Sequence, residues 1–418
     1  MKIEYLFIVL FAILSFGLHS QNVPLKLQQK WDKESSTPEI TLLNHKPSRL
    51  PDRVFITPLE SDNRSLAFTW RTDTSVANAQ IEIMQGDSLS FSNEDIMQID
   101  ASHKKIVYKD YPMHYHTAEV SHLKPDKIYR YRVGHSPYWS SWYTFSQQNF
   151  NDTINFLYFG DTQNGIFDQS KRIYKEAIKK FGNSKFALHA GDLINHANND
   201  YEWAEWHAAT EDINTSMPVI ATPGNHEYLK NLEGSKVQLS AYWTTVFPFP
   251  YEWEAGQYFF DYGFVRFIVL NSNEKISEQA VWMDSLLTTT NQEWVVILSH
   301  HPVFSGAKGR VNKGLQENWL PVIEKHKHKI GLVLQGHDHT YARGGLLNRT
   351  GTKERPVHPV FTVSVVGRKY YQLEKQSWMD TGYNNVSSYQ YIQITRDKIA
   401  YKAYSQTNTL IDEFQISK

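Results

Sequence analysis

The segment LVLQGHDH, residues 332–339, is an apolar run that breaks at a glycine and ends in two histidines around an aspartate. The apolar run predicts a buried strand, and the glycine permits a tight backbone turn where that strand ends. Both histidines then lie on one loop directly after the strand. The chain contains 18 histidines, so this pair carries weight only if other polar motifs occupy equivalent positions.

Four further motifs directly follow predicted strands. The strands are predicted at 156–159, 186–190, 218–221 and 294–298, and the motifs after them are GDTQ (160–163), GDL (191–193), GNHE (224–227) and SHHP (299–302). Ligands of α/β sheets bind at the carboxyl ends of strands, because strand ends and helix starts converge there. Each motif alone is weak, since a strand-end aspartate is often only a helix cap. Together they supply carboxylate, amide and imidazole groups, which predicts a binuclear site for ions such as Zn, Fe or Mn, with His337 and His339 serving different ions.

The order of predicted elements divides the chain into two domains. From residue 50 to residue 147, short segments alternate between apolar and polar residues, as at Leu66, Phe68 and Trp70, which predicts a β-sandwich. The run around Tyr129 resembles the corner of fibronectin type III sandwiches, where a tyrosine hydroxyl bonds to upstream backbone. From residue 152 to residue 418, strands alternate with helices predicted at 168–181, 201–213, 278–287 and 315–326, which indicates an α/β domain.

The first residues predict export. Lys2 precedes an apolar run over residues 5–18, and Ser20 offers a small residue for cleavage, so residues 1–20 are predicted to be a signal peptide. The alternative is a retained anchoring helix, although the run is short for a membrane span. Residues 21–49 are predicted to be an arm or linker. The chain has no cysteine, which excludes disulfides and a lipid anchor on an N-terminal cysteine, so we expect a secreted or periplasmic protein without a membrane anchor.

The series GD, GD, GNHE, SHHP and GHDH resembles the calcineurin-like metallophosphoesterases. Two further features resemble the purple acid phosphatase branch of that family. One is the predicted sandwich ahead of the α/β domain, and the other is the pair of segments YFFDYG (258–263) and HTYAR (339–343). The resemblance runs from residue 50 to the C-terminus. It implies a fibronectin type III-like β-sandwich followed by a four-layer α/β/β/α metallophosphoesterase domain.

The resemblance also implies a role for each motif residue. The metal ligands would be Asp161 and His339 for the first ion, Asn225, His300 and His337 for the second, and Asp192 as a bridge between both. His226 would be catalytic together with the bridging Asp192, because it would face the substrate and protonate the leaving group or steady the phosphoryl oxygens. Further substrate-binding residues would be Asn225 and His301, with Arg343 as an additional candidate.

Two positions depart from the family's pattern. Where purple acid phosphatases have a tyrosine that binds ferric iron and gives the colour, this chain has Asn195. Where many broader relatives have a histidine ligand, it has Gln163, whose amide oxygen is a weaker ligand than imidazole for softer ions. Gln163 is a candidate ligand, and the alternative is that it only hydrogen-bonds to a metal-bound water. The identity of the metals therefore stays open.

The resemblance implies a metal-dependent phosphoric-ester hydrolase that cleaves phosphomonoesters by in-line attack of a metal-bound hydroxide. Its substrate would be a small phosphorylated molecule or an exposed phosphoester. The net charge of −1 does not indicate the positively charged surface that binds nucleic acid. A phosphodiesterase or nucleotide hydrolase that uses the same metals is the first alternative. A binding protein with a relic domain is the second, and the intact ligand pattern argues against it.

Overall fold

The computed structural model describes residues 45–59, 64–86, 96–251, 256–346 and 359–418. The predicted signal peptide and most of the predicted arm lie outside these residues, so both stay predictions. Within the described ranges, no helix is both long enough and apolar enough to cross a bilayer.

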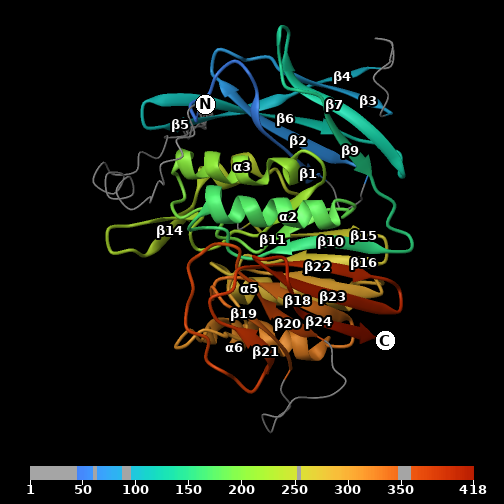
Figure 1. Ribbon diagram of the computed structural model, residues 1–418, viewed down its shortest axis with the longest axis vertical. Helices are drawn as coiled ribbons and strands as arrows, with labels where there is room; N and C mark the ends of the chain where they lie inside the picture. The colour runs from blue at the N-terminus through green and yellow to red at the C-terminus, as the bar shows by residue number, and fades with distance from the viewer. Residues whose placement is uncertain (1–44, 60–63, 87–95, 252–255, 347–358) are drawn as a thin grey trace, which may run out of the picture.

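The N-terminal domain is a sandwich of two antiparallel sheets (Figure 1). Phe68, Trp70, Ile81 and Tyr131 are completely buried between the sheets, because alternate residues of a strand face the partner sheet. One sheet has the order β1-β2-β6-β5, and the other has the order β4-β3-β7-β8 with β9 beside β7. The strands are β1 (Asp52–Pro58), β2 (Leu66–Asp73), β3 (Gln80–Gln85), β4 (Met97–Asp100), β5 (Ser102–Tyr108), β6 (Tyr111–Val120), β7 (Lys127–His135), β8 (Tyr138–Trp139) and β9 (Tyr143–Gln147).

The predicted sandwich is therefore confirmed. The hydroxyl of Tyr129 accepts the backbone N–H of Lys124 at 2.9 Å, which is the upstream bond that the sequence around this tyrosine predicts.

The second domain begins with a six-stranded sheet of the order β12-β11-β10-β22-β23-β24. Strands β10, β11 and β12 are parallel, so their carboxyl ends lie at one edge, and the three later strands are antiparallel. The elements are β10 (Ile154–Phe159), η2 (Ile166–Ser170), α2 (Lys171–Phe181), β11 (Ala187–His189), α3 (Asp200–Asn214), β12 (Val219–Ala221), β22 (Ser388–Ile394), β23 (Lys398–Ser405) and β24 (Leu410–Ser417).

A seven-stranded sheet of the order β15-β16-β17-β18-β20-β19-β21 forms the other half of this domain. Strands β16, β17, β18 and β20 are parallel, which again gathers carboxyl ends at one edge. The elements are β15 (Tyr258–Tyr262), β16 (Val265–Val269), α5 (Ile276–Thr289), β17 (Trp294–Leu298), α6 (Lys313–Lys325), β18 (Ile330–Gln335), β19 (Tyr341–Gly345), β20 (Val360–Val363) and β21 (Met379–Tyr383). Three elements follow β12 and precede β15 in the chain: the hairpin strands β13 (Tyr228–Lys230) and β14 (Lys236–Leu239) and the short helix α4 (Ala241–Val246). The sequence did not predict them.

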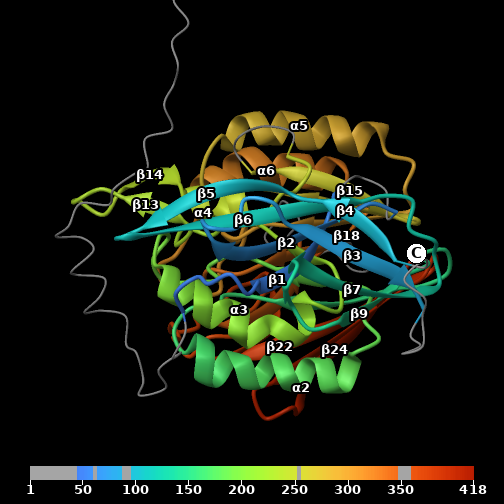
Figure 2. The ribbon, with the colours of Figure 1, turned by 90° about the horizontal axis from the view of Figure 1, so that it is seen from above.

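The two sheets pack against each other with helices on both outer faces. Figure 2 shows α2 and α3 on one side of the sheets and α5 and α6 on the other. Phe156 on β10 and Phe186, directly before β11, contact Phe267 of the second sheet, with ring centroids 5.6 and 5.3 Å apart. The hydroxyl of Tyr158 on β10 accepts the backbone N–H of Gln335 at the end of β18 at 2.9 Å. This bond fixes the motif after β10 relative to the motif after β18, and the layer order α/β/β/α confirms the expected fold.

The sandwich contacts the second domain through buried charges. Asp200, the first residue of α3, is fully buried and accepts from Arg53 Nη1 at 2.6 Å and from Arg71 Nη1 at 3.2 Å. Burial alone would raise the pKa of Asp200, but the two guanidinium groups hold it below its usual value. Removing one partner of such a group leaves an uncompensated buried charge, so both arginines of the sandwich are needed beside Asp200.

Candidate metal centre

Each of the five polar motifs begins within four residues of the end of a parallel strand. Asp161 follows β10, Asp192 follows β11, Asn225 follows β12, His300 follows β17 and His337 follows β18. Because both sheets gather their parallel strand ends at one edge, the five loops meet there. Asp161, Asp192 and His300 bring ligand atoms within 4.8 Å of one another, and so do His300, His301 and His337.

Glycines make room for the two aspartates. A Cβ on Gly336 would lie 2.3 Å from Asp161 Oδ1, and a Cβ on Gly224 would lie 2.1 Å from Asp192 Oδ1. Any side chain at either position would therefore collide with a carboxylate of the site. The glycines in GHDH and GNHE are required by this close approach.

Three residues of the site have left-handed backbone. The φ angles are 52° at Asp192, 71° at His337 and 48° at His339. Positive φ is uncommon outside glycine, and such strained residues gather at functional sites. The turn at residues 336–339 directs both histidines into the site, while Asp338 between them turns away. Asp338 Oδ2 accepts from Ser305 Oγ and Gly306 N, both at 2.7 Å, which fastens the loop to the segment after β17.

The first group of side chains surrounds Asp161. His339 Nε2 lies 3.1 Å from Asp161 Oδ2, and both side chains are buried. His339 Nδ1 lies 2.9 Å from the carbonyl oxygen of Lys369, which can only accept, so Nδ1 must carry the proton. In the neutral ring, Nε2 then presents a lone pair to a carboxylate oxygen. Two acceptors at this distance indicate a place for a cation.

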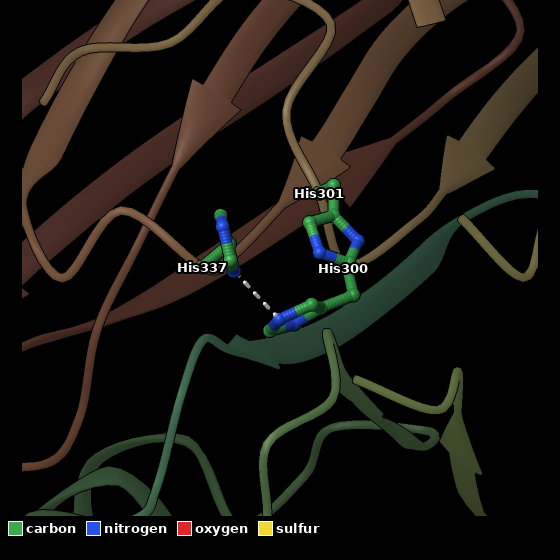
Figure 3. A group of neighbouring side chains, drawn as sticks. All are labelled: His300, His301 and His337. Carbon is green, nitrogen blue, oxygen red and sulfur yellow. Dashed lines mark hydrogen bonds between the residues drawn. The ribbon is translucent and has the colours of Figure 1, made fainter. Parts of the chain in front are cut away.

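The second group surrounds His300 (Figure 3), whose ring Nε2 lies 3.1 Å from His337 Nδ1 and 3.2 Å from Asn225 Oδ1. The same nitrogen is 3.3 Å from Asp192 Oδ2. His300 Nδ1 donates to the carbonyl oxygen of Ala190 at 2.8 Å, so in the neutral ring Nε2 presents a lone pair to the oxygens of Asn225 and Asp192. Burial alone would lower the pKa of His300, but the carboxylates of Asp192 and Asp161 raise it to about 9. The site thus stabilises positive charge at Nε2, either as a proton or as a metal ion.

Buried atoms without partners support the same conclusion. Asp161 Oδ2 and Gln163 Oε1 make no hydrogen bond among the described residues, although both side chains are fully buried. An unpaired buried acceptor costs free energy, of the order of 1–3 kcal/mol. The donor set of carboxylate, amide and imidazole groups therefore fits Zn, Fe or Mn.

Asp192 and His226 are tied to each other and to the surrounding loops. Asp192 Oδ1 accepts the backbone N–H of His226 at 2.8 Å. His226 Nδ1 donates to the carbonyl oxygen of Asn195 at 2.6 Å, which leaves Nε2 available to another group. Burial lowers the pKa of His226 despite the nearby Asp192 carboxylate. The ring is therefore held in one orientation beside the candidate bridge.

Glu227 holds the loops of the site through their backbone N–H groups, a role that the sequence did not predict. Its carboxylate is fully buried and accepts three backbone N–H groups, from Asp192 at 2.9 Å, Leu193 at 2.8 Å and Gly224 at 2.6 Å. Burial and the neighbouring Asp192 carboxylate raise the pKa of Glu227 to about 8. The position of Glu227 in the GNHE motif could have indicated this role. A carboxylate next to an amide and an imidazole in sequence is a candidate to hold their loop in place.

Arg343 and Arg310 have different surroundings in the structure. Arg343, an additional candidate for substrate binding, donates from Nε to Asp412 at 2.7 Å and from Nη1 to Asp380 at 2.9 Å. These carboxylates hold its guanidinium on β19, and its role in substrate binding stays a prediction. Arg310 instead contacts the site, with Nη2 against His337 Nε2. Nothing in the surrounding sequence indicated this.

His301 lies beside the second group. Its backbone N–H and its Nδ1 are each 2.8 Å from Ser272 Oγ. The His301 ring packs on the His337 ring with centroids 4.2 Å apart, as Figure 3 shows. His301 is therefore close enough to join the second group, whereas the resemblance implies a substrate-facing role for it.

Comparisons with known proteins identify the class. Residues 154–341 match the family of calcineurin-like phosphoesterases, and residues 51–147 match the purple acid phosphatase N-terminal domain. The chain therefore carries a calcineurin-like phosphoesterase domain preceded by a purple acid phosphatase N-terminal domain. This confirms the family that the motif series resembles.

The similar proteins include plant and animal acid phosphatases. "Probable inactive purple acid phosphatase 24" of Arabidopsis thaliana is 27% identical over 56% of this chain and 44% of that protein. Phosphoenolpyruvate phosphatase of Allium cepa is 26% identical over 70% of this chain and 63% of its own length. Acid phosphatase type 7 of Mus musculus is 23% identical, covering 55% of this chain and 57% of the mouse protein. The chain spans less than half the length of the Arabidopsis relatives that it matches.

Two solved structures share the fold. The purple acid phosphatase of yellow lupin (Lupinus luteus) seeds superposes with a TM-score of 0.72 and 18% identity, over 88% of this chain and 74% of the lupin chain. The structure of PhoD superposes with a TM-score of 0.65 and 14% identity, over 91% of this chain and 94% of that chain. Both therefore agree with the sandwich followed by the α/β domain.

Proposed function

We propose that the chain hydrolyses phosphomonoesters with two metal ions held by the candidate ligands. When bound, two cations would polarise the phosphate oxygens and lower the pKa of a bound water. The proposal rests on pairs of hydrogen-bond acceptor atoms that face each other inside the site. His339 Nε2 faces Asp161 Oδ2 at 3.1 Å, and His300 Nε2 faces Asn225 Oδ1 at 3.2 Å. These contacts are what a set of metal ligands presents to its ions.

The ligands divide between two ions. Asp192 is the candidate bridge, because its Oδ2 lies 3.3 Å from His300 Nε2 of the second group and accepts at 2.8 Å from Gln163 Nε2, which lies 3.3 Å from His339 Nε2 of the first. The ligands proposed for the first ion are Asp161 and His339, and those for the second are Asn225, His300 and His337.

His226 is the proposed group for the leaving alcohol. The bond from Nδ1 to the Asn195 carbonyl fixes the ring and leaves Nε2 for a substrate oxygen. A phosphate bound beside the ring would oppose the effect of burial on the His226 pKa, because negative charge favours the protonated ring. A protonated His226 could then donate to the departing oxygen.

The charges around the site favour monoesters over diesters. Positive charge on Lys230 and Lys369 contributes to the lowered pKa of His226, and Lys236 and Arg310 act in the same direction on His301. These four cations therefore contribute positive potential to the region. A monoester dianion carries more negative charge than a diester, so such a potential attracts it more strongly.

The alternative of an inactive relic has a basis in the relatives' names, since three Arabidopsis relatives are named probable inactive purple acid phosphatases. In this chain the Asp, Asn and His donors present in the five motifs argue for activity. We also infer export, which is supported by the apolar run after Lys2 and the small Ser20.

The test is hydrolysis by purified protein that has been stripped with a chelator and then reloaded with Zn, Mn or Fe. We expect phenyl phosphate to be cleaved only after reloading, with kcat/KM about tenfold or more above that for bis(phenyl) phosphate. Faster cleavage of the diester would favour the phosphodiesterase alternative. No cleavage of either ester with any of these metals would refute the proposal.

A further inference from the structure

A hollow opens beside the second group of candidate ligands. It has a volume of about 300 Å³ and is lined by Pro302, Arg310, Val311, Asn312, Lys313 and His337. Because His337 lines the hollow and also faces His300 at 3.1 Å, a ligand at the proposed metal centre could extend directly into it. Two of the six lining residues are cationic, and none is acidic.

Arg310, which lines this hollow, is held in place by its neighbours. Its Nε lies 3.6 Å from Asp338 Oδ1, and its guanidinium lies over the Tyr371 ring, 4.5 Å from the centroid. Asp338 Oδ2 is already occupied by Ser305 and Gly306. The guanidinium is thus positioned by one longer ion pair and one aromatic face, which keeps its orientation without saturating its donors.

Arg310 has one further contact, with a candidate ligand. Its Nη2 contacts His337 Nε2, which must act as the acceptor because a guanidinium only donates. This contact uses one of the five guanidinium N–H groups, so Arg310 keeps donors for an anion in the hollow.

We propose that Arg310 and Lys313 form a second anion site, so that the preferred substrates are phosphoesters with another carboxylate or phosphoryl group a few bonds from the scissile phosphate. This inference rests on the proposed function, because it places the scissile phosphate at the metal centre. Arginine suits the role since its planar donors bind carboxylate and phosphoryl oxygens in pairs. Lys313 is exposed at the start of α6 and adds charge without touching the candidate ligands.

Calorimetric binding of non-hydrolysable phosphonates to zinc-loaded protein tests the inference without requiring turnover. The matched pair is propylphosphonate and 2-carboxyethylphosphonate, which have the same chain length and differ by the terminal carboxylate. Ethane-1,2-diphosphonate replaces that carboxylate by a phosphoryl group and separates the two kinds of anion. We expect the unmodified protein to bind at least one of the doubly anionic ligands about tenfold to a hundredfold more tightly than propylphosphonate.

Variants show whether the preference belongs to this hollow. Arg310→Gln should remove most of it, and Lys313→Gln should reduce it about threefold to fivefold, as for an exposed charge. Lys325→Gln is the matched control, since Lys325 lies at the other end of α6 and pairs with Asp284 at 2.8 Å. The control should keep the full preference. Metal content is measured for each variant, because Arg310 adjoins a candidate ligand.

The outcomes separate the two proposals. If propylphosphonate binds and no doubly anionic ligand is preferred, the second anion site is overturned while the metal centre stands. A preference that survives in both Arg310→Gln and Lys313→Gln also overturns it, because the second anion would then be bound elsewhere, for example by the metals. If no phosphonate binds to the zinc-loaded protein, the proposed function fails and the inference fails with it.

Discussion

Gln163 Nε2 lies 2.8 Å from Asp192 Oδ2 and donates a hydrogen bond to it inside the site. The same nitrogen is 3.3 Å from His339 Nε2, while Gln163 Oε1 is buried without a partner. An amide nitrogen has no lone pair to give to a metal. In this orientation Gln163 supports Asp192, and it could become a ligand only if its amide turned to present Oε1.

Replacing Gln163 by histidine should strengthen the first metal position. An imidazole beside Asp161 and His339 adds a ligand better suited to zinc than an amide oxygen. We expect Gln163→His to raise zinc affinity by about tenfold, the lower end of the effect of changing a group beside a metal, as measured by competition with a chromophoric chelator. Gln376→His, at an exposed glutamine, is the control and should leave affinity unchanged. An unaltered affinity in Gln163→His would place this residue away from the ion.

Removing the His226 imidazole should slow turnover and spare the metals. His226 is bonded to Asn195 and Asp192 through groups other than Nε2, so its loss leaves the proposed ligands in place. We expect His226→Ala to lower kcat by about 10²–10⁴-fold, the range for a lost acid or base. The loss should be smaller for esters with good leaving groups, such as 4-nitrophenyl phosphate. Equal losses for poor and good leaving groups would assign His226 to phosphate positioning instead.

Replacing Glu227 should lower the stability of the fold. Glu227→Ala leaves the N–H groups of Asp192, Leu193 and Gly224 unpaired in the interior. At about 1–3 kcal/mol for each unsatisfied group, we expect the free energy of unfolding to fall by about 3 kcal/mol or more, as measured in urea. Glu227→Gln retains one acceptor oxygen and should lose less. If Glu227→Ala unfolds at the same urea concentration as the unmodified protein, Glu227 does not hold these loops.

The protein loaded with ferric iron should be pale. The family's colour needs a tyrosinate on the iron, and Asn195 stands at that position. The Asn195 carbonyl accepts from His226, which places this residue beside the site. Asn195→Tyr should introduce a visible absorption band when iron is supplied. A strong band in the unmodified protein would contradict the account, and Tyr371→Phe would then show whether Tyr371, whose ring packs on His339 at 4.9 Å, supplies the phenolate.

The strand-end motifs could be predicted because local sequence determines them. An apolar run followed by glycine and a polar residue marks a strand end, and parallel strands bring such ends to one edge. The same pattern predicts that Asp161, Asp192 and His300 lie together, as they do in the structure. The hairpin β13–β14 was missed, since its three- and four-residue strands are too short for a periodic pattern.

Contacts between distant residues could not be predicted in this way. The partners of Arg343 lie 37 and 69 positions away at Asp380 and Asp412, so no local pattern shows that its charge is already matched. Arg310 reaches His337 across 27 positions from a segment without regular periodicity. The orientation of the Gln163 amide likewise depends on Asp192, 29 positions further along the chain.

The most direct test of the two-metal centre is the metal content of the unmodified protein compared with Asp192→Ala, measured by elemental analysis after dialysis. Asp192 is the ligand shared by both ions in this account, so its removal should loosen both together. We predict two metal ions per chain in the unmodified protein and far fewer than one in Asp192→Ala, with hydrolysis lost. Asp284→Ala, at a surface carboxylate on α5, should keep both ions. Retention of two ions and normal turnover in Asp192→Ala would contradict the account.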